Sequence, residues 1–136
     1  MATKTWFRKL CVETRQRTEM INLTARLQAL VAEAQVGEGL LVAHALHTTA
    51  GLTINENADP DVVHDLLAQL ERLANRPDYR HTEGNSDAHL KATLVGASVT
   101  IPVSRGRLVL GTWQGVYFCE FDGPRHRELA VKIMEG

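Results

Sequence analysis

The sequence has no long apolar segment. Its N-terminus, Met1 to Trp6, lacks the apolar stretch that forms the centre of a signal peptide. No later run comes near the roughly 18 apolar residues that mark a transmembrane helix. These absences argue against secretion and against a membrane span, so we expect a cytoplasmic protein with no membrane partner.

Cysteine is also scarce. The two cysteines, Cys11 and Cys119, stand in apolar, strand-like surroundings, and neither belongs to a CxxC pair. This context favours buried free thiols over a redox pair or a zinc ribbon. A disulfide is the alternative that the sequence leaves open, because both residues can lie on neighbouring strands.

An excess of charge of one sign is missing as well. The formal net charge is −1, with 15 Lys and Arg against 16 Asp and Glu. This balance gives no electrostatic footprint for a polyanion, so nucleic acid is not an expected partner. The sequence also lacks a Gly-rich phosphate loop, a GxSxG elbow and a dinucleotide fingerprint.

The composition is sufficient for a folded core. The chain has 136 residues, of which 44% are hydrophobic and 23% are charged. A chain of this size and composition can bury a core without metal or disulfide staples. No repeat, low-complexity tract or linker interrupts it, so we expect a single domain over residues 1–136.

Hydrophobic periodicity predicts the elements of the first half. Alternation predicts a strand over residues 5–13, and the polar run 14–19 predicts a loop. One apolar stripe predicts a helix from an N-cap at Asn22 to about Ala34, lying on a sheet. The apolar run 39–46, bounded by glycine, is typical of a buried strand.

A second helix and a third, shorter one are predicted in the middle of the chain. A short strand over 51–55 precedes the second helix, which starts at Asp59 with a proline at its first position and ends before Pro77. The third helix spans 86–95. The buried side of the second helix is predicted to consist of Val62, Val63, Leu66, Leu67, Leu70 and Leu73.

After the third helix the period of the pattern changes to two. The joints between the strands are turn-like, so we expect an antiparallel meander in this half. The whole chain is therefore predicted to be an α+β fold with one or two antiparallel β-sheets, two longer helices and one short helix. The four expected strands are 98–103, 107–110, 116–122 and 128–134.

The chemistry-dense part of the chain is residues 81–89. In an extended chain its alternate side chains project to one side; if a helix instead starts at Ser86, His89 lies near the first turn. Either geometry gathers proton-transferring or metal-binding groups, whereas a solvated loop is the plainer alternative. The groups are His81, Glu83, Asn85, Asp87 and His89.

Two histidines accompany the predicted strand 39–46. Their HxxH spacing sends His44 and His47 to opposite faces of a strand, so they are not expected to bind one ion together. His44 is predicted to be a satisfied core or interface histidine, whereas His47, at the strand's end, enters a cleft. Glu56 and Asn57 either flank the same cleft or are ordinary turn residues.

Residues 112–115 interrupt the C-terminal strands with a tryptophan and an amide next to glycine. Trp113 is either an aromatic at a strand edge or a surface on which a flat ring can stack. Cys119 is predicted to lie in the core, and no neighbour in the sequence supports a thiolate nucleophile. Residues 104–107 are predicted to form a solvated hairpin turn, although either arginine can reach an anion.

Four segments of the sequence form a recognisable set. They are His47-Thr48-Thr49-Ala50-Gly51, Asn55-Glu56-Asn57-Ala58-Asp59-Pro60-Asp61-Val62, His81-x-Glu83-Gly84-Asn85-x-Asp87-Ala88-His89, and Gly111-Thr112-Trp113-Gln114-Gly115 with Phe118-x-Glu120-Phe121-Asp122-Gly123-Pro124-Arg125. Together they closely resemble the YjbQ-like family, also called secondary thiamine-phosphate synthases. The resemblance implies a small α+β fold that assembles as a homotrimer, with a polar pocket near the subunit contacts.

The resemblance also implies an activity. Thiamine-phosphate synthases join a hydroxymethylpyrimidine diphosphate to a thiazole phosphate and release pyrophosphate, so the expected partner is a small phosphorylated substrate. Departure of pyrophosphate leaves cationic charge on the ring and anionic charge on the leaving group, so a divalent cation or basic groups should contact the diphosphate.

These expectations assign roles to the polar residues. The catalytic residues are predicted to be His47, His81, Glu83 and Asp87. The substrate-binding residues are predicted to be Thr48, Glu56, Asn57, Asn85, Lys91, Trp113 and Gln114. A divalent ion, Mg²⁺ or Zn²⁺, is predicted to bind among His47, His81, Glu83, Asp87 and His89.

Two other functions fit the same residues. One is a non-catalytic module that binds a metal or a small anion. The other is a metal-dependent hydrolase, in which a bound water attacks a phosphate ester.

Overall fold

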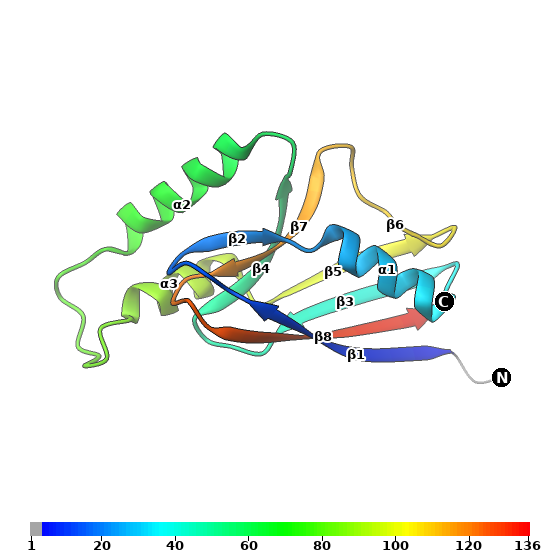
Figure 1. Cartoon of the computed structure of the whole chain (residues 1–136), viewed down its shortest axis with the longest axis horizontal. Helices are drawn as coiled ribbons and strands as arrows, with labels where there is room; N and C mark the ends of the chain where they lie inside the picture. Colours follow the sequence, from blue (N-terminus) through cyan, green and yellow to red (C-terminus); the bar gives the residue numbers. More distant parts are fainter. Residues whose placement is uncertain (1–3) are drawn as a thin grey trace.

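Two antiparallel sheets and three helices make up the fold of the computed structural model, which describes residues 4–136 (Figure 1). This architecture confirms the predicted α+β class. In the larger sheet the strands lie in the order β1-β8-β3-β5-β6. Their bounds are Thr5–Glu13 for β1, His126–Glu135 for β8, Gly39–Ala45 for β3, Ser98–Ser104 for β5 and Arg107–Leu108 for β6.

The smaller sheet has the order β2-β7-β4. Its strands are β2 (Glu19–Asn22), β7 (Gln114–Glu120) and β4 (Ala50–Glu56). Strand β2 was not predicted, because its four residues are too few to show an alternating pattern.

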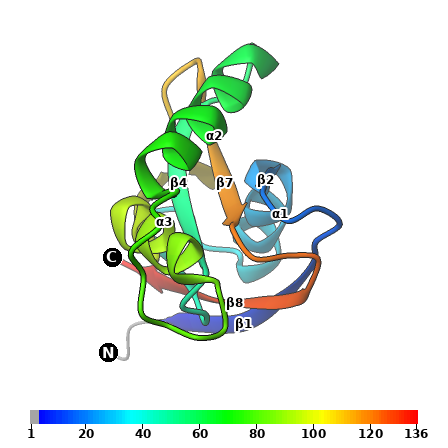
Figure 2. The same ribbon diagram turned by 90° about the vertical axis from the view of Figure 1, so that its left-hand side faces the viewer.

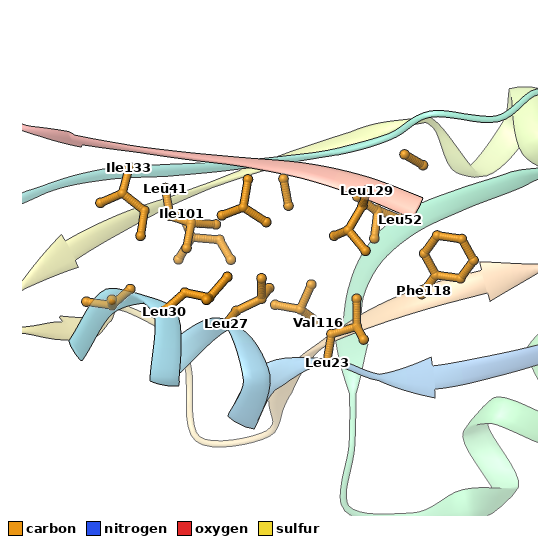
Figure 3. Packing of buried hydrophobic residues seen from close by; sticks show 14 of the residues in the cluster. Leu23, Leu27, Leu30, Leu41, Leu52, Ile101, Val116, Phe118, Leu129 and Ile133 are labelled. Atoms are coloured by element: carbon orange, nitrogen blue, oxygen red, sulfur yellow. The ribbon is translucent and has the colours of Figure 1, made fainter. Parts of the chain in front are cut away.

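Helix α1 spans Thr24–Ala34, and Leu23 occupies the N-cap position that was predicted for Asn22. Asn22 nevertheless caps this end, since its Oδ1 accepts hydrogen bonds from the backbone N–H of Thr24 at 3.0 Å and from the Thr24 hydroxyl at 2.7 Å. The predicted apolar stripe is buried. Figure 3 shows Leu27 and Leu30 of this helix directed at Ile133 and Ile101 of the larger sheet.

Strand β7 is buried on both faces, and this position connects two clusters of apolar side chains. Val116 and Phe118 pack into the core between α1 and the larger sheet, whereas Tyr117 and Cys119 face the opposite side. Helices α2 (Pro60–Ala74) and α3 (Ser86–Val95) cover that opposite side (Figure 2). The small sheet is thus the middle layer of the fold.

Helix α2 is less buried than its apolar stripe predicts. It begins as expected, with the Asp59 side chain accepting from the N–H of Asp61 at 2.9 Å. Leu73, however, is 62% exposed, and the other apolar residues of the stripe are only half-buried. The prediction of a fully buried side was therefore wrong for the single chain.

Neither this helix nor any other in residues 4–136 is both long and apolar enough to cross a membrane.

The predicted C-terminal meander was wrong. Strands β5 and β6 form a hairpin, but β7 joins the smaller sheet and β8 lies between β1 and β3. Period-two alternation identifies a strand but does not name its partner, and here the last strand pairs with the first over nine residue pairs from Thr5↔Met134 to Glu13↔His126.

The two cysteines are free thiols, but only one is buried. Cys11 lies on the outward face of β1 with Phe7, while Val12 and Leu10 point inward, so the predicted burial of Cys11 was wrong. Cys119 is buried, and desolvation raises the pKa of its thiol to about 12. This thiol is therefore protonated at neutral pH and is not a nucleophile.

Shortening a core leucine should measure the contribution of the layer between α1 and the larger sheet. Leu27 is fully buried, so Leu27→Ala should lower the free energy of unfolding by about 2 to 5 kcal/mol. Chemical denaturation followed by circular dichroism gives this value. Gln69→Ala, at an exposed position of α2, is the control and should change it by less than about 0.5 kcal/mol. Equal effects at the two positions would contradict this core.

Candidate functional site

A polar cavity of about 490 Å³ lies at the end of the smaller sheet where α3 begins. Its walls come from the loop after β3, the turn before α3, the loop after β7 and the first residues of β8. Segments that are far apart in the sequence therefore meet here. The lining residues are Leu46, His47, Thr48, Thr49, His81, Glu83, Asn85, His89, Asp122, Arg125 and Arg127.

Most of the predicted site residues near residues 47 and 81 meet at this cavity. The loop after β3 delivers two of them, and the 81–89 stretch delivers four. The turn before α3 is possible because Gly84 adopts a φ of 78°, in the left-handed region. The predicted residues that share the cavity are His47, Thr48, His81, Glu83, Asn85 and His89.

Asp87 lies elsewhere. Its two carboxylate oxygens each accept a hydrogen bond from Arg17 Nη2 at 3.1 Å. This ion pair lines a second, larger cavity of about 660 Å³, between α2 and the start of α3. The larger cavity has a more apolar wall, with Leu67, and gathers none of the six predicted residues named above.

Lys91 is also away from the cavity. Its side chain is 1% exposed, its ammonium group is bonded to the Glu71 carboxylate, and it lies 6.0 Å from the centre of the Phe121 ring. The lysine thus links α3 to α2. In this position it is not a lining residue of the polar cavity.

The remaining predicted residues lie at the far end of the smaller sheet. Strand β7 runs from Gln114, at that end, to Glu120, beside the cavity, a length of about 20 Å. Trp113 is 63% exposed, and its carbonyl accepts from the N–H of Asn57 at 2.9 Å. Glu56 is the last residue of β4, opposite Gln114. Within one protomer these four residues do not reach the cavity.

Local contacts account for two of those four residues. Gln114 Oε1 accepts from the N–H of Gly111 at 2.7 Å and so closes its own turn. Asn57 packs directly against the backbone of Gly115, where a Cβ would stand 2.6 Å from Asn57 Nδ2. The glycine therefore allows this side chain to approach the sheet.

A buried ion pair forms the floor of the cavity. Arg127 Nε donates to Glu120 Oε1 at 2.8 Å, and Arg127 Nη2 donates to Glu120 Oε2 and, at 2.9 Å, to Thr49 Oγ1. Thr14 Oγ1 donates to Glu120 Oε1 at 2.7 Å. Burial alone would raise the pKa of Glu120, but the hydrogen bonds from Arg127 and Thr14 hold it below its ordinary value.

His47 has a fixed tautomer. The backbone N–H of Glu128 donates to His47 Nε2 at 2.8 Å, so Nε2 carries a lone pair. The proton of the neutral ring is therefore on Nδ1, which is a hydrogen-bond donor. Burial, followed by the nearby Arg127 guanidinium, lowers the pKa of His47.

His81, Glu83 and His89 form the more open side of the cavity. The two imidazole rings meet edge to face, with centroids 5.8 Å apart and planes at 83°. Glu83 Oε1 lies 3.8 Å from His81 Nε2. This side offers a carboxylate next to two rings that can carry a proton.

Asn85 and Asp122 also line the cavity and are bonded to each other. Asn85 Nδ2 donates to Asp122 Oδ2 at 2.9 Å, and Arg125 Nη2 donates to the same oxygen at 3.0 Å. Burial would raise the pKa of Asp122, but the hydrogen bonds from Asn85 and Arg125 lower it. The other amide atom, Asn85 Oδ1, is buried and has no hydrogen-bond partner among residues 4–136.

The five predicted metal ligands do not converge in one protomer. Over residues 4–136, no three side chains of His, Cys, Asp or Glu come together as a metal site. Asp87 is paired with Arg17, and the Nε2 lone pair of His47 is taken by Glu128. A divalent ion therefore stays a prediction.

Four charged residues of the site were not assigned from the sequence, namely Glu120, Asp122, Arg125 and Arg127. Three of them, Glu120, Asp122 and Arg125, belong to the segment from Phe118 to Arg125 that carries part of the family resemblance, and Arg127 follows that segment. The available signal was a glutamate and an arginine inside apolar strand runs. Charges at such positions are seldom buried without a partner.

The fold and this cavity define a small α+β protein with a polar site at one end of its inner sheet. A family model described as "UPF0047 protein YjbQ-like" matches residues 8–136. The chain belongs to this family, as its sequence motifs predicted.

Relatives match over most of their length. The UPF0047 protein MJ1081 of Methanocaldococcus jannaschii is 48% identical over 127 residues, covering 93% of this chain and 92% of the relative. YugU of Bacillus subtilis is 48% identical over 128 residues, covering 92% and 96%. A crystal structure from Clostridium acetobutylicum, described as an uncharacterized conserved protein of the YjbQ/UPF0047 family, has a TM-score of 0.91 at 48% identity and covers 93% of this chain and 98% of that chain.

The Glu120–Arg127 pair should make stability depend on pH in the acid range. The folded-state pKa of Glu120 lies below its ordinary value of 4.5, so the carboxylate stabilises the fold above about pH 4.5 and loses this contribution as the pH falls through the lower, folded-state pKa. Glu120→Gln should lower the free energy of unfolding at pH 7 by about 3 kcal/mol and flatten its acid slope. Denaturation between pH 3 and 7 measures both.

The exposed Glu33, which pairs with Arg8 at the surface, provides the control for that experiment. Glu33→Gln should leave the acid slope unchanged, because exposed ion pairs contribute little. A Glu120→Gln protein with the wild-type slope would contradict a stabilising role for the buried pair.

The tautomer of His47 can be measured directly. Because Glu128 donates to Nε2, nitrogen-15 NMR at pH 7 should show a neutral ring protonated at Nδ1, and the ring should titrate below its ordinary pKa of 6.5. His47→Gln assigns the signal by its loss. A proton on Nε2, or titration at or above 6.5, would show that the Glu128 contact does not persist in solution.

Proposed function

We propose that this chain is a transferase of the thiamine-phosphate synthase type, which joins hydroxymethylpyrimidine diphosphate to thiazole phosphate and releases pyrophosphate. One observation carries the proposal: His47 is held as an Nδ1–H donor in a cavity that it shares with Arg127, two further histidines and two carboxylates. The family resemblance supplies the reaction class. The geometry supplies groups that can perform it.

The reaction requires opposite charges to be stabilised in one place. The bond between the pyrimidine methylene carbon and the diphosphate oxygen breaks, and the thiazole nitrogen forms a new bond to that carbon. Pyrophosphate leaves with the electron pair and gains hydrogen bonds from Arg127 and from His47 Nδ1–H. The carboxylates of Glu83 and Asp122 face the same cavity and favour the cationic ring.

A non-catalytic binding module is the second candidate, and a specific feature favours it. Both arginines of the cavity are already paired with carboxylates, Arg125 with Asp122 and Arg127 with Glu120. The cavity therefore supplies oriented hydrogen bonds more than free positive charge. Such a site can hold a small anion without assisting the departure of pyrophosphate.

Assembly into a homotrimer is part of the proposal. The larger sheet has a face that is not covered by a helix, and Phe7, Leu40 and Met134 are each 42 to 49% exposed there. Leu40 pairs directly with Met134, and Phe7 pairs with Lys132, two residues away on the same strand face. An apolar patch of this kind supports an interface between copies of the chain.

The activity should be tested with both thiamine precursors, in Mg²⁺, in Zn²⁺ and in neither, with detection of thiamine phosphate. Loss of the donor on His47 should reduce kcat by about 100-fold or more, because pyrophosphate then leaves without it. His47→Ala tests this, and His44→Ala is the matched control. His44 lies three residues earlier on β3, is exposed and bonds Ser98 instead.

Other outcomes of the assay with the thiamine precursors would support one of the two alternative functions. Binding of a precursor without turnover would support the binding module. Release of phosphate from one precursor alone would support a hydrolase. Equal activity of the two alanine variants, with both folded by circular dichroism, would remove His47 from the mechanism.

A further inference from the structure

Asn85, which lines the polar cavity, has a buried hydrogen-bond acceptor without a donor in the described part of the chain. Asn85 is 8% exposed, and its Oδ1 atom is buried without a partner among residues 4–136. A buried acceptor of this kind destabilises a fold unless something bonds to it. Asn85 stands at the N-cap position of α3, where an amide oxygen ordinarily accepts a backbone N–H, yet its side chain makes no capping bond. The acceptor is thus kept out of the helix.

The orientation of this amide is fixed by its neighbour. Asn85 Nδ2 donates to Asp122 Oδ2 at 2.9 Å, and Arg125 donates to Asp122 through both Nη2 and Nε. Exchanging the amide atoms would place Oδ1 against the Asp122 carboxylate, so the network assigns Nδ2 to that contact. Asp122 is therefore a positioning residue, and it leaves Oδ1 as the amide atom without a partner in residues 4–136.

The chemistry of the surroundings limits what can satisfy Oδ1. An anion is excluded at this atom, because two acceptors repel each other. A metal ion needs several ligands, and no three His, Cys, Asp or Glu side chains of residues 4–136 converge to provide them. The carboxylate oxygen bonded to this amide, Asp122 Oδ2, already accepts from both Asn85 and Arg125. A single N–H or O–H donor needs only the one acceptor that is available.

We propose that the cavity recognises an amino group of its ligand, with an N–H donating to Asn85 Oδ1. This inference rests on the proposed function, since the hydroxymethylpyrimidine of that reaction carries a ring amino group. The ligand class is an aminopyrimidine with an anionic substituent. The amino group binds Asn85, and the anionic part takes the donors of His47 and Arg127, which line the same cavity.

Two diphosphates that differ in one group test the inference on the wild-type protein. One is the aminopyrimidine diphosphate, and the other has a methyl group in place of the amino group. Calorimetry should show about tenfold or greater preference for the amino compound, the difference expected of one hydrogen bond to a buried acceptor. Equal affinities, or no binding of either compound at millimolar concentration, would overturn the inference.

The variant Asn85→Ala tests whether Asn85 causes the preference for the amino compound. In Asn85→Ala the amino and methyl compounds should bind within about threefold of each other, with the affinity for the methyl compound near its wild-type value. Asn75→Ala is the matched control, because Asn75 ends α2 and lines the larger cavity; it should keep the preference. Persistence of the preference in Asn85→Ala would overturn the assignment. Because the wild-type comparison needs no variant, instability of Asn85→Ala does not remove the test.

Titration with Mg²⁺ or Zn²⁺ alone separates a metal from an amino donor. Metal binding that is present in the wild type and lost in Asn85→Ala would show that Oδ1 is a metal ligand, which would overturn the inference. The transferase proposal is tested separately by product formation. An amino preference without thiamine phosphate would leave the inference standing and reject the transferase, whereas thiamine phosphate without an amino preference would do the reverse.

Discussion

The ion pair between Glu120 and Arg127 joins the two sheets. Glu120 ends β7 of the smaller sheet and Arg127 belongs to β8 of the larger one, and both side chains are almost completely buried. Thr14 and Thr49 occupy hydrogen-bonding positions around the pair. A buried charge without its partner is strongly destabilising, so this contact fixes how the sheet ends meet. The polar cavity lies at that junction, because Arg127 is one of its lining residues.

Two polar groups in the cavity are oriented by neighbouring groups. A backbone N–H of β8 sets the tautomer of His47, and Asp122 sets the amide of Asn85. Both arginines of the cavity are paired with carboxylates, so the site relies on directed donors and acceptors more than on free positive charge. Preorganised groups of this kind need no rearrangement when a ligand binds.

The residues that carry the family motifs fall at two ends of the smaller sheet. The cavity gathers one group, and Trp113 with its neighbours lies about 20 Å away along β7. Several members of the second group have local structural partners, such as Gln114 with Gly111. Trp113 itself is exposed, so another copy of the chain in the proposed homotrimer can contact it. The uncovered apolar face of the larger sheet supports such an assembly.

The sequence determined most of the element types and the family, because alternation and helical stripes are local properties that survive folding. It also identified His47 and residues 81–89 as candidate site residues, since few other stretches combine imidazole, carboxylate and amide groups. Tertiary structure decided the partners: β8 beside β1, Asp87 with Arg17, and Lys91 with Glu71. Only the tertiary structure revealed the buried ion pair between Arg127 and Glu120. It also revealed that Asn85 Oδ1 has no hydrogen-bond partner among residues 4–136. These contacts join residues from distant parts of the chain, and no local pattern encodes which distant group will meet a side chain.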